Sequence, residues 1–204
     1  KTRGMILMNH GVFSFAQTAR ESYERMIELV DRAERYLKRS KAWAIPSSKE
    51  QAARISSQDI ATLRQSISKL AGFPLLLHTR QSPNALAFCR RPDLARLAGQ
   101  GPATPDHSIR TKRIPMLGRD AGAYARAYAK YFDTHARRAK SPKTMLDPAP
   151  RVILDPELGL CTSGRSAKDT AIAAEIYEHT MAVILRAQAL GGYRALSARD
   201  IFDV

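Results

Sequence analysis

The fold of this chain is decided by the stretch Gly4-Met5-Ile6-Leu7-Met8-Asn9-His10-Gly11-Val12-Phe13-Ser14-Phe15, followed by a polar segment that starts a helix. The two apolar runs, at 5–8 and 12–15, are typical of short buried strands, and Asn-His-Gly between them predicts a bend. Thr18 and Glu21 have the spacing of a capping box, so a helix is expected to begin after Thr18. Apolar residues then recur at helical spacing, and the helix should end near Lys41. The pattern predicts a strand, a bend, a second strand and a helix.

This stretch closely resembles the closing part of the class II aldolase/adducin family, in which an apolar strand ends in Asn-His-Gly and a Thr-capped helix follows. The histidine of that motif is one of three His ligands of a catalytic zinc in the family, and it corresponds to His10 in this sequence. The resemblance places the other two ligands and a catalytic Glu upstream of the motif, whereas this chain starts at Lys1. It therefore implies that residues 1–41 are the C-terminal piece of an aldolase domain. Considered within this chain alone, His10 is better read as an unmetallated cleft histidine, because zinc sites need three or four ligands.

Capped amphipathic helices alternate with short apolar runs in the rest of the chain. This alternation predicts a layered α/β domain over residues 51–192, with helices packed on a mixed sheet. Strands are expected near Leu75–His78 and Val152–Leu154, and 159–163 is expected to continue the second strand. Residues 42–50 are read as a linker and 101–117 as a loop. Helices are expected over about 56–72, 92–99, 120–139 and 166–191, and a further helix is expected to start at Ser82-Pro83.

The first stretch recurs later in the chain. Gly11 falls on Gly159, 148 positions later, and at the same offset Thr18 falls on Ser166. Self-similarity of this kind points to two copies of one strand–bend–strand–helix unit. The second copy has Leu158 where the first has His10, and leucine cannot ligate zinc. We therefore expect residues 51–192 to be a degenerate aldolase-like domain that keeps the fold without this ligand.

A second resemblance concerns the strings Thr104-Pro105-Asp106-His107-Ser108-Ile109-Arg110-Thr111-Lys112 and Gly164-Arg165-Ser166-Ala167-Lys168. They look like the middle region of bifunctional proteins that join a rhamnulose-1-phosphate aldolase-like class II domain to a short-chain dehydrogenase. Residues 193–204 look like the linker towards that dehydrogenase domain, which is missing here. The resemblance implies zinc and a sugar-phosphate substrate in the intact parent, and NAD(P) only in the dehydrogenase domain. This chain has no glycine-rich dinucleotide fingerprint.

Two function classes follow from these resemblances. The first is a fragment of a bifunctional zinc-dependent sugar-phosphate aldolase and dehydrogenase, catalytically incomplete by itself and without catalytic residues of its own. The second is a non-catalytic, adducin-like scaffold or oligomerisation module. In either case, the apolar strands and helix of residues 1–40 should dock onto the larger domain or pair with a second copy. We favour pairing, and thus a homo-oligomer.

The chain is strongly basic, with 33 Lys and Arg against 19 Asp and Glu, a net charge of +14. The charges are dispersed and no nucleic-acid motif is present, which favours a solvated surface or an acidic ligand such as a sugar phosphate over nucleic acid. The run Arg110–Arg113 could bind a phosphate through Lys112, but an exposed basic loop is the simpler interpretation. No apolar run approaches the length of a membrane span. Cys89 and Cys161 lack metal-ligand spacing, so we read them as reduced core residues of a cytoplasmic protein.

The remaining histidines are weaker candidates for functional residues. His107 follows Asp106 in a polar segment, so the carboxylate could orient its ring, although adjacent residues rarely face each other. His78 lies in His-Thr-Arg, which resembles the His-Thr-His of aldolases with Arg80 in place of the second ligand, and is read as a vestige or a coincidence. His135 and His179 fall within predicted helices and are expected to be structural or solvent-facing. An aromatic stripe from Tyr124 to His135 is expected to be core.

Overall fold

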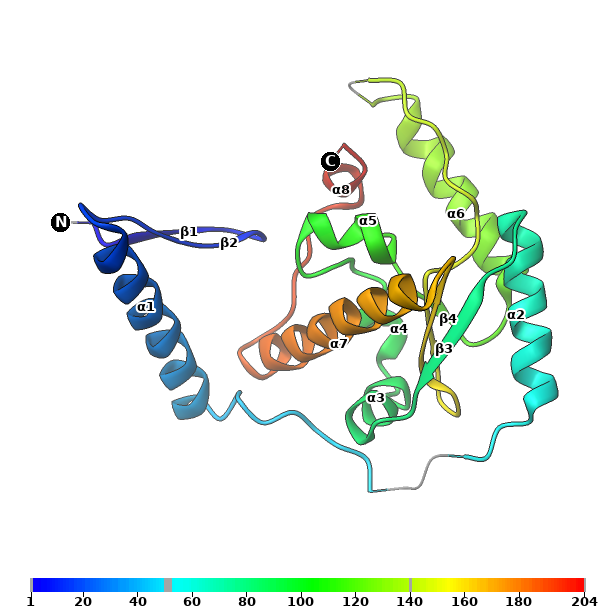
Figure 1. The fold of residues 1–204 in the computed structure, drawn as a ribbon, viewed down its shortest axis with the longest axis horizontal. Coiled ribbons are helices and arrows are strands. Elements are labelled where there is room, and N and C mark those ends of the chain that lie inside the picture. Colours follow the sequence, from blue (N-terminus) through cyan, green and yellow to red (C-terminus); the bar gives the residue numbers. More distant parts are fainter. Residues whose placement is uncertain (1, 50–52, 140, 204) are drawn as a thin grey trace.

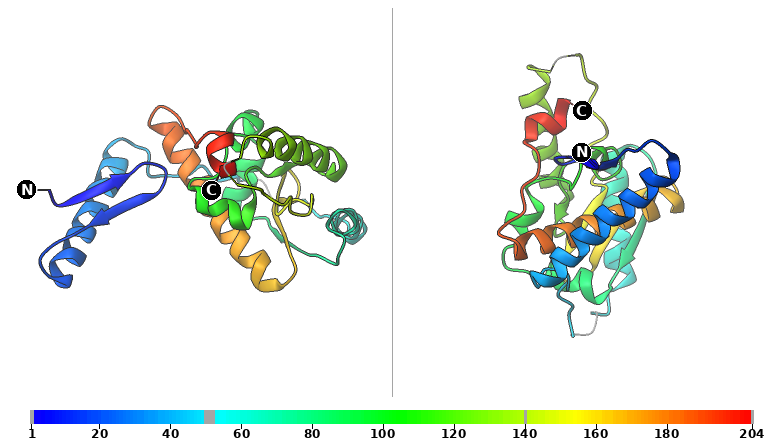
Figure 2. Two further views of the ribbon diagram at one scale, coloured as in Figure 1. Left: turned by 90° about the horizontal axis from the view of Figure 1, so that it is seen from above. Right: turned by 90° about the vertical axis from the view of Figure 1, so that its left-hand side faces the viewer.

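Two parts of unequal size make up the chain in the computed structural model, which describes residues 2–49, 53–139 and 141–203. The smaller part is a hairpin of β1 (Gly4–Leu7) and β2 (Gly11–Ser14) followed by α1 (Ala19–Arg39). It stands to one side of the larger part in Figure 1 and in the left view of Figure 2, and an extended strap joins the two. The predicted order of strand, bend, strand and helix is therefore confirmed, and the helix ends two residues before Lys41. The expectation that these two strands are buried is wrong, because the hairpin stands apart from the larger part in Figure 1 and most of its residues are exposed.

The larger part is built on a four-stranded mixed sheet in the order β3-β6-β5-β4. β3 and β5 run antiparallel to β6, and β4 runs parallel to β5. The mixed sheet and the strands expected near residues 75–78 and 152–154 are confirmed. The strands are β3 (Leu76–Arg80), β4 (Met116–Leu117), β5 (Val152–Asp155) and β6 (Gly159–Gly164).

Helices cover both faces of this sheet, which makes the larger part a layered α/β domain as predicted (Figure 1). One face carries α3 (Pro83–Cys89), α4 (Leu94–Ala98) and α7 (Ala167–Ala189). The other face carries α2 (Ser57–Ala71) and α6 (Ala121–Ala136). The shorter elements are η1 (Pro105–His107), α5 (Ser108–Thr111) and α8 (Ala198–Asp203).

Alternate residues of the central strands supply two separate cores. Val152 and Leu154 of β5 pack under α3, α4 and α7, whereas Ile153 between them packs under α2 and α6. This follows from the pleat, which points successive side chains to opposite faces. Because both faces are covered, every residue of β5 and β6 is buried, including the polar side chains of Asp155, Thr162 and Ser163. Cys89 and Cys161 are free and buried, as expected, and burial raises the pKa of both thiols to about 12.

Helix boundaries follow the capping residues closely. Ser56 accepts a hydrogen bond from the Gln58 amide at 3.1 Å, and Gly72 ends α2 in the left-handed region with φ 78°. Ser82 caps α3 in the same way, by accepting from the Ala85 amide at 3.3 Å. The expected start at Pro92 is wrong, because α4 begins only after Asp93. The predicted helix over 120–139 is shorter and ends at residue 136.

Two sequence interpretations need correction. Residues 159–163 do not continue the strand that precedes them; they form β6, which folds back antiparallel to β5 through a tight bend. Residues 101–117 are not a plain loop, since they contain η1, α5 and the short strand β4. Helix α5 packs against α7, so this segment is anchored to the domain.

The segments before and after the domain lie against it. The cations of Lys38 and Arg186 both lie over the ring of Trp43, at 4.9 and 4.3 Å from its centroid. The Ser48 amide donates to the Pro83 carbonyl at 2.8 Å, so the strap contacts the domain at the start of α3. The predicted boundary at residues 50 and 51 lies outside the described residues. The tail, read as a linker, packs onto the domain through α8 and through the Tyr193 hydroxyl, which donates to the Gly101 carbonyl at 3.0 Å.

None of the described helices is long and apolar enough to cross a lipid bilayer.

Candidate functional site

The hairpin–helix unit at the start of the chain and the one formed by β5, β6 and α7 share one local structure. Strand β1 pairs with β2 from Leu7↔Gly11 to Gly4↔Ser14, and β5 pairs with β6 from Asp155↔Gly159 to Val152↔Thr162. Every paired position in one hairpin lies 148 residues from its counterpart in the other. The predicted order of strand, bend and helix is confirmed, and the register coincides as well.

The link from the second strand to the helix is also the same in both units. Ser14 Oγ donates to the Ser22 carbonyl at 2.8 Å, and Thr162 Oγ1 donates to the Thr170 carbonyl at 2.9 Å, at equivalent positions. Thr18 and Ser166 each accept from a backbone amide three residues later, at 3.2 and 3.1 Å. Both helices begin at the next residue. Matched caps and strands thus produce matched backbones.

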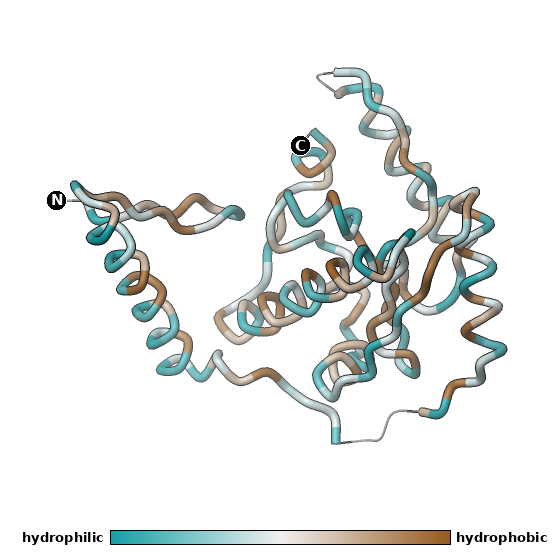
Figure 3. Tube along the Cα trace, viewed as in Figure 1, coloured by the Kyte–Doolittle hydropathy of each residue, from teal (hydrophilic) through white to brown (hydrophobic). Residues whose placement is uncertain are grey.

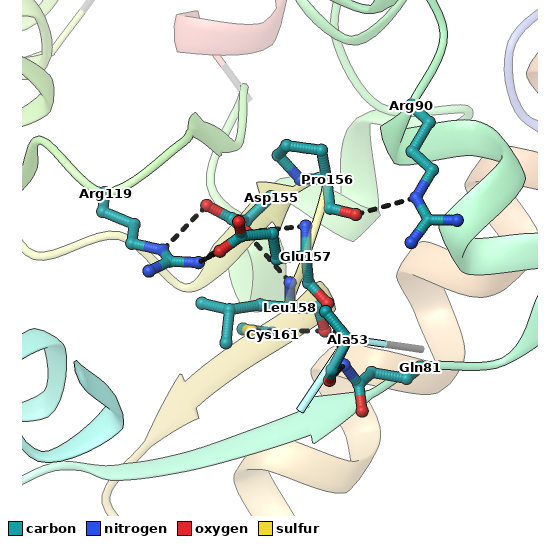
Figure 4. Close-up of polar contacts among 9 residues, drawn as sticks. All are labelled: Ala53, Gln81, Arg90, Arg119, Asp155, Pro156, Glu157, Leu158 and Cys161. Carbon is teal, nitrogen blue, oxygen red and sulfur yellow. Dashed lines mark hydrogen bonds and ion pairs between the residues drawn. The ribbon is translucent and has the colours of Figure 1, made fainter. Parts of the chain in front are cut away.

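The two bends are closed by different groups. In the first, Asn9 takes a left-handed φ of 58° and the His10 amide donates to the Leu7 carbonyl at 3.1 Å. In the second, the Asp155 carboxylate replaces that carbonyl and accepts from the amides of Glu157 and Leu158, both at 2.9 Å (Figure 4). The sequence pattern does not distinguish a bend that is closed by a backbone carbonyl from one that is closed by a carboxylate.

Arg119 anchors the second bend to the rest of the domain. Its Nε and Nη2 donate to the two Asp155 oxygens at 2.9 and 3.1 Å, and Nη2 also reaches Glu157 (Figure 4). Burial alone raises the pKa of Asp155, but Arg119 and the two amides outweigh it and hold the pKa below its usual value. Asp155 is therefore an ionised, buried carboxylate with a structural role.

The equivalent positions His10 and Leu158 have opposite environments. Leu158 is 1% exposed in the core beneath α2 and α6. The His10 side chain is 45% exposed, stacks on Phe13 at 5.8 Å, and has Nδ1 at 3.9 Å from Asp106 Oδ2. The position that is partly exposed in one unit, at His10, is thus a core position in the other, at Leu158.

The donor set around His10 does not fit a zinc ion by itself. Zinc takes three or four nitrogen, sulfur or oxygen ligands, and among the described residues Asp106 is the one carboxylate within ion-pair distance of His10. No group of three His, Cys, Asp or Glu side chains that could hold a metal occurs within the described ranges. We therefore derive no catalytic step through a metal from these residues.

The tip of the first hairpin meets the larger part close to η1. Asn9 Nδ2 donates to the Arg194 carbonyl at 3.3 Å, beside the His10–Asp106 contact. His107, which follows Asp106 in the sequence, places its ring edge-to-face with the ring of His179, with centroids 6.4 Å apart. Burial, followed by the His179 charge, lowers the pKa of His107. Its Nδ1 is buried and has no hydrogen-bond partner in the described part of the chain.

The other sequence candidates lie elsewhere. His78 is exposed on β3 and accepts from Arg80 Nε at 3.3 Å, while Arg80 also pairs with Glu178 on α7. His135 lies in an aromatic cluster, 5.0 Å from the Tyr131 ring and 5.6 Å from the Phe202 ring. The structure therefore brings His10, His107 and His179 into one region and leaves these two outside it.

Lys112 is buried, so the simpler interpretation of its segment as an exposed basic loop is wrong. The residue is only 5% exposed and takes a left-handed φ of 59° directly after α5. Its Nζ donates to the Asp147 carbonyl and lies 3.9 Å from the centroid of the Tyr128 ring. Both partners are distant in sequence, which is why the local pattern could not reveal them.

Within the part of the chain that the structure describes, the charge of Lys112 has no direct carboxylate partner. The nearby Asp147 carboxylate is already engaged by Arg151, at 3.0 Å to Nη1, and by the Ala149 amide at 3.2 Å. Burial, followed by repulsion from Arg151, lowers the pKa of Lys112 to about 7. Near neutral pH, a substantial fraction of this amine is therefore uncharged.

A cleft of about 210 Å³ opens beside Lys112, between α5, α6 and α8. Arg113 and Lys143 add two further cations to its lining, and Ser108 and Thr144 add hydroxyl groups. Tyr128 and Tyr131 of α6 form one wall, together with apolar side chains from α5, α8 and the segment before β5. The aromatic stripe of α6 thus has two environments: Tyr124 is buried in the core, while the next two tyrosines line the cleft.

Comparison with known proteins assigns the larger part to a protein family. Residues 54–204 match the family described as aldolase class II, second domain. Because the match covers most of the chain, the chain belongs to this family.

One curated relative extends the comparison to the smaller part. The uncharacterized oxidoreductase YuxG of Bacillus subtilis (strain 168) is 22% identical over 227 residues, in an alignment that covers 98% of this chain and 32% of that protein. The chain thus spans about a third of the length of this relative. No solved structure matches the chain.

Proposed function

We propose that this chain is an internal part of a bifunctional enzyme that joins a zinc-dependent sugar-phosphate aldolase to an NAD(P)-dependent short-chain dehydrogenase. Membership of the aldolase class II second-domain family supports the aldolase half. The name of YuxG, an oxidoreductase three times as long as the aligned region, supports the fusion with a dehydrogenase. The observation that carries the proposal is the common register of the two hairpins, with His10 at the bend of one and Leu158 at the bend of the other.

The two parts have different roles in this proposal. Residues 1–41 are the end of a catalytic aldolase domain and contribute His10 as one metal ligand. Residues 51–192 are a degenerate second copy that keeps the fold and has the buried Leu158 at the ligand position. The chain is then catalytically incomplete by itself, and the sugar phosphate, the zinc and the NAD(P) belong to the full-length protein.

The test uses the full-length protein and two histidine variants. We expect His10→Ala to lower cleavage of rhamnulose 1-phosphate at least about a hundredfold, as losses of metal-site residues do, while NAD(P)-dependent aldehyde oxidation persists. His78→Ala is the matched control, because His78 is an exposed strand histidine outside the His10 region. Unchanged cleavage in His10→Ala would contradict the proposal.

A scaffold role for the larger part is the second candidate. It is favoured by Leu158 at the ligand position and by the first hairpin, whose backbone trace is largely coloured as hydrophobic in Figure 3. Apolar side chains there are exposed, such as Ile6 at 70% and Met8 at 80%. Such surfaces commonly become covered in assemblies. In this role the chain would form a homo-oligomer through residues 1–40, detectable by light scattering. A full-length protein that assembles but has no cleavage activity would favour this candidate over the first.

A further inference from the structure

The cleft beside Lys112 has no assigned role in the proposed aldolase or dehydrogenase activity. It is lined by an amine that is held inside the domain by a backbone carbonyl and an aromatic ring. The residue also carries a left-handed φ of 59°. Non-glycine residues adopt a positive φ only at a cost in free energy, and such strain occurs preferentially at functional sites. A lysine placed only for solubility needs neither burial nor strain.

We propose that this cleft is a carbonyl-binding site in which the Lys112 amine forms an imine with a small aldehyde or ketone that carries an anionic group. The proposal does not depend on the proposed enzyme activity of the full-length protein. It depends on three features of the cleft: its nucleophile, its charge and its size.

The nucleophile is suited to addition because it is partly uncharged at neutral pH. Desolvation of lysine in a pocket of this kind is a general way to activate it towards carbonyl groups. The nitrogen bonds to the carbonyl carbon, and the carbonyl oxygen leaves as water with the two hydrogens of the neutral amine. The reaction is reversible and needs no oxidant or reductant.

The charge of the lining selects an anionic ligand. Arg113 and Lys143 flank Lys112, and no carboxylate contributes to the described lining of the cleft. Arg113 is held in place by donating to the Gln100 carbonyl at 3.1 Å and by lying 5.2 Å from the Tyr131 ring. It therefore offers a fixed positive charge to a phosphate or carboxylate group.

The size restricts the ligand to a small molecule. A volume of about 210 Å³ is below the range of roughly 300–1,000 Å³ that drug-sized ligands occupy. The hydroxyls of Ser108 and Thr144 suit a hydroxylated carbon chain. A hydroxylated aldehyde or ketone of a few carbons, with one anionic group, meets all three conditions.

The experiment is reductive trapping on the whole protein. Glyceraldehyde 3-phosphate, and separately uncharged glyceraldehyde, is added with cyanoborohydride at pH 7, and modified lysines are located by peptide mass spectrometry. We expect Lys112 to be labelled at least about tenfold faster than exposed lysines, because its uncharged fraction is larger by a factor on the order of a thousand. Lys143→Met keeps the Lys112 amine and removes one cation from the cleft lining. This variant should reduce labelling of Lys112 by the phosphate ester more than labelling by glyceraldehyde.

The outcomes separate an imine site from a structural lysine. If labelling follows solvent exposure and spares Lys112, the proposal is wrong. Equal labelling of Lys112 by the two aldehydes would overturn the preference for an anion. Lys112→Met should abolish the selective label, and circular dichroism establishes whether that variant is folded. The positions of the labelled lysines in the protein without substitutions test the proposal even if Lys112→Met does not fold.

Discussion

The carboxylate of Asp155 is the most informative single group in the larger part, and we expect Asp155→Ala to destabilise the protein strongly. The residue is 4% exposed and holds the β5–β6 bend through two backbone amides and Arg119. Removing it leaves the amides of Glu157 and Leu158 without their acceptor and Arg119 with Glu157 alone.

The magnitude follows from these contacts. Breaking a buried ion pair by removing one partner costs about 3–5 kcal/mol, and each unsatisfied buried amide costs about 1–3 kcal/mol. Arg119 is about a third exposed and keeps Glu157 as a partner, so the full sum does not apply. We expect a loss of about 3 kcal/mol in the free energy of unfolding.

Urea denaturation followed by circular dichroism measures this loss, with Glu157→Ala as the matched control. Glu157 binds the same guanidinium but its side chain is 62% exposed, so its pair should contribute less than about 1 kcal/mol. A loss below about 1 kcal/mol for Asp155→Ala, or equal losses in the two variants, would refute the assigned role of Asp155. The folded pKa of Asp155 is lowered, so its contribution is present above the unfolded pKa of 3.8 and is lost as pH falls below that value.

Two further predictions concern Lys112 and the helix caps. The folded pKa of Lys112, about 7, lies below its unfolded value of 10.5, so the unfolded state binds more protons between them and stability should rise with pH. Between pH 7 and 9, this rise should reach up to about 1.4 kcal/mol per unit in urea denaturation and disappear in Lys112→Met; an unchanged rise in the variant would contradict it. Ser166→Ala should lower global stability by about 1 kcal/mol, because α7 packs into the core. Thr18→Ala should instead speed amide exchange within α1, which has no buried residue, and a shift of the global urea midpoint would oppose this view.

The sequence predicted the parts of the fold that depend on local chemistry. The caps at Thr18, Ser56 and Ser166 were recognisable because a hydroxyl followed by a polar or acidic residue marks a helix start. The repeated unit was recognisable because caps and apolar runs recur at one offset. Both kinds of signal lie within a few residues, where pattern and structure correspond closely.

The parts that could not be predicted depend on contacts between distant residues. The reversal at Asp155 requires Arg119 to stabilise a carboxylate that the local pattern assigns to the end of a strand. Lys112 is buried because a carbonyl 35 positions later and a ring on α6 accept its ammonium group. A run of basic residues alone indicates exposure, so the sequence pointed the wrong way at this site.

The most direct test of the central claim is the zinc content of the full-length protein after dialysis. Our account, in which the first unit supplies a ligand and the second has lost it, predicts one zinc per chain, lost in His10→Ala and retained in His78→Ala. Zinc retained in His10→Ala, or two zinc ions per chain in the unmodified protein, would contradict it.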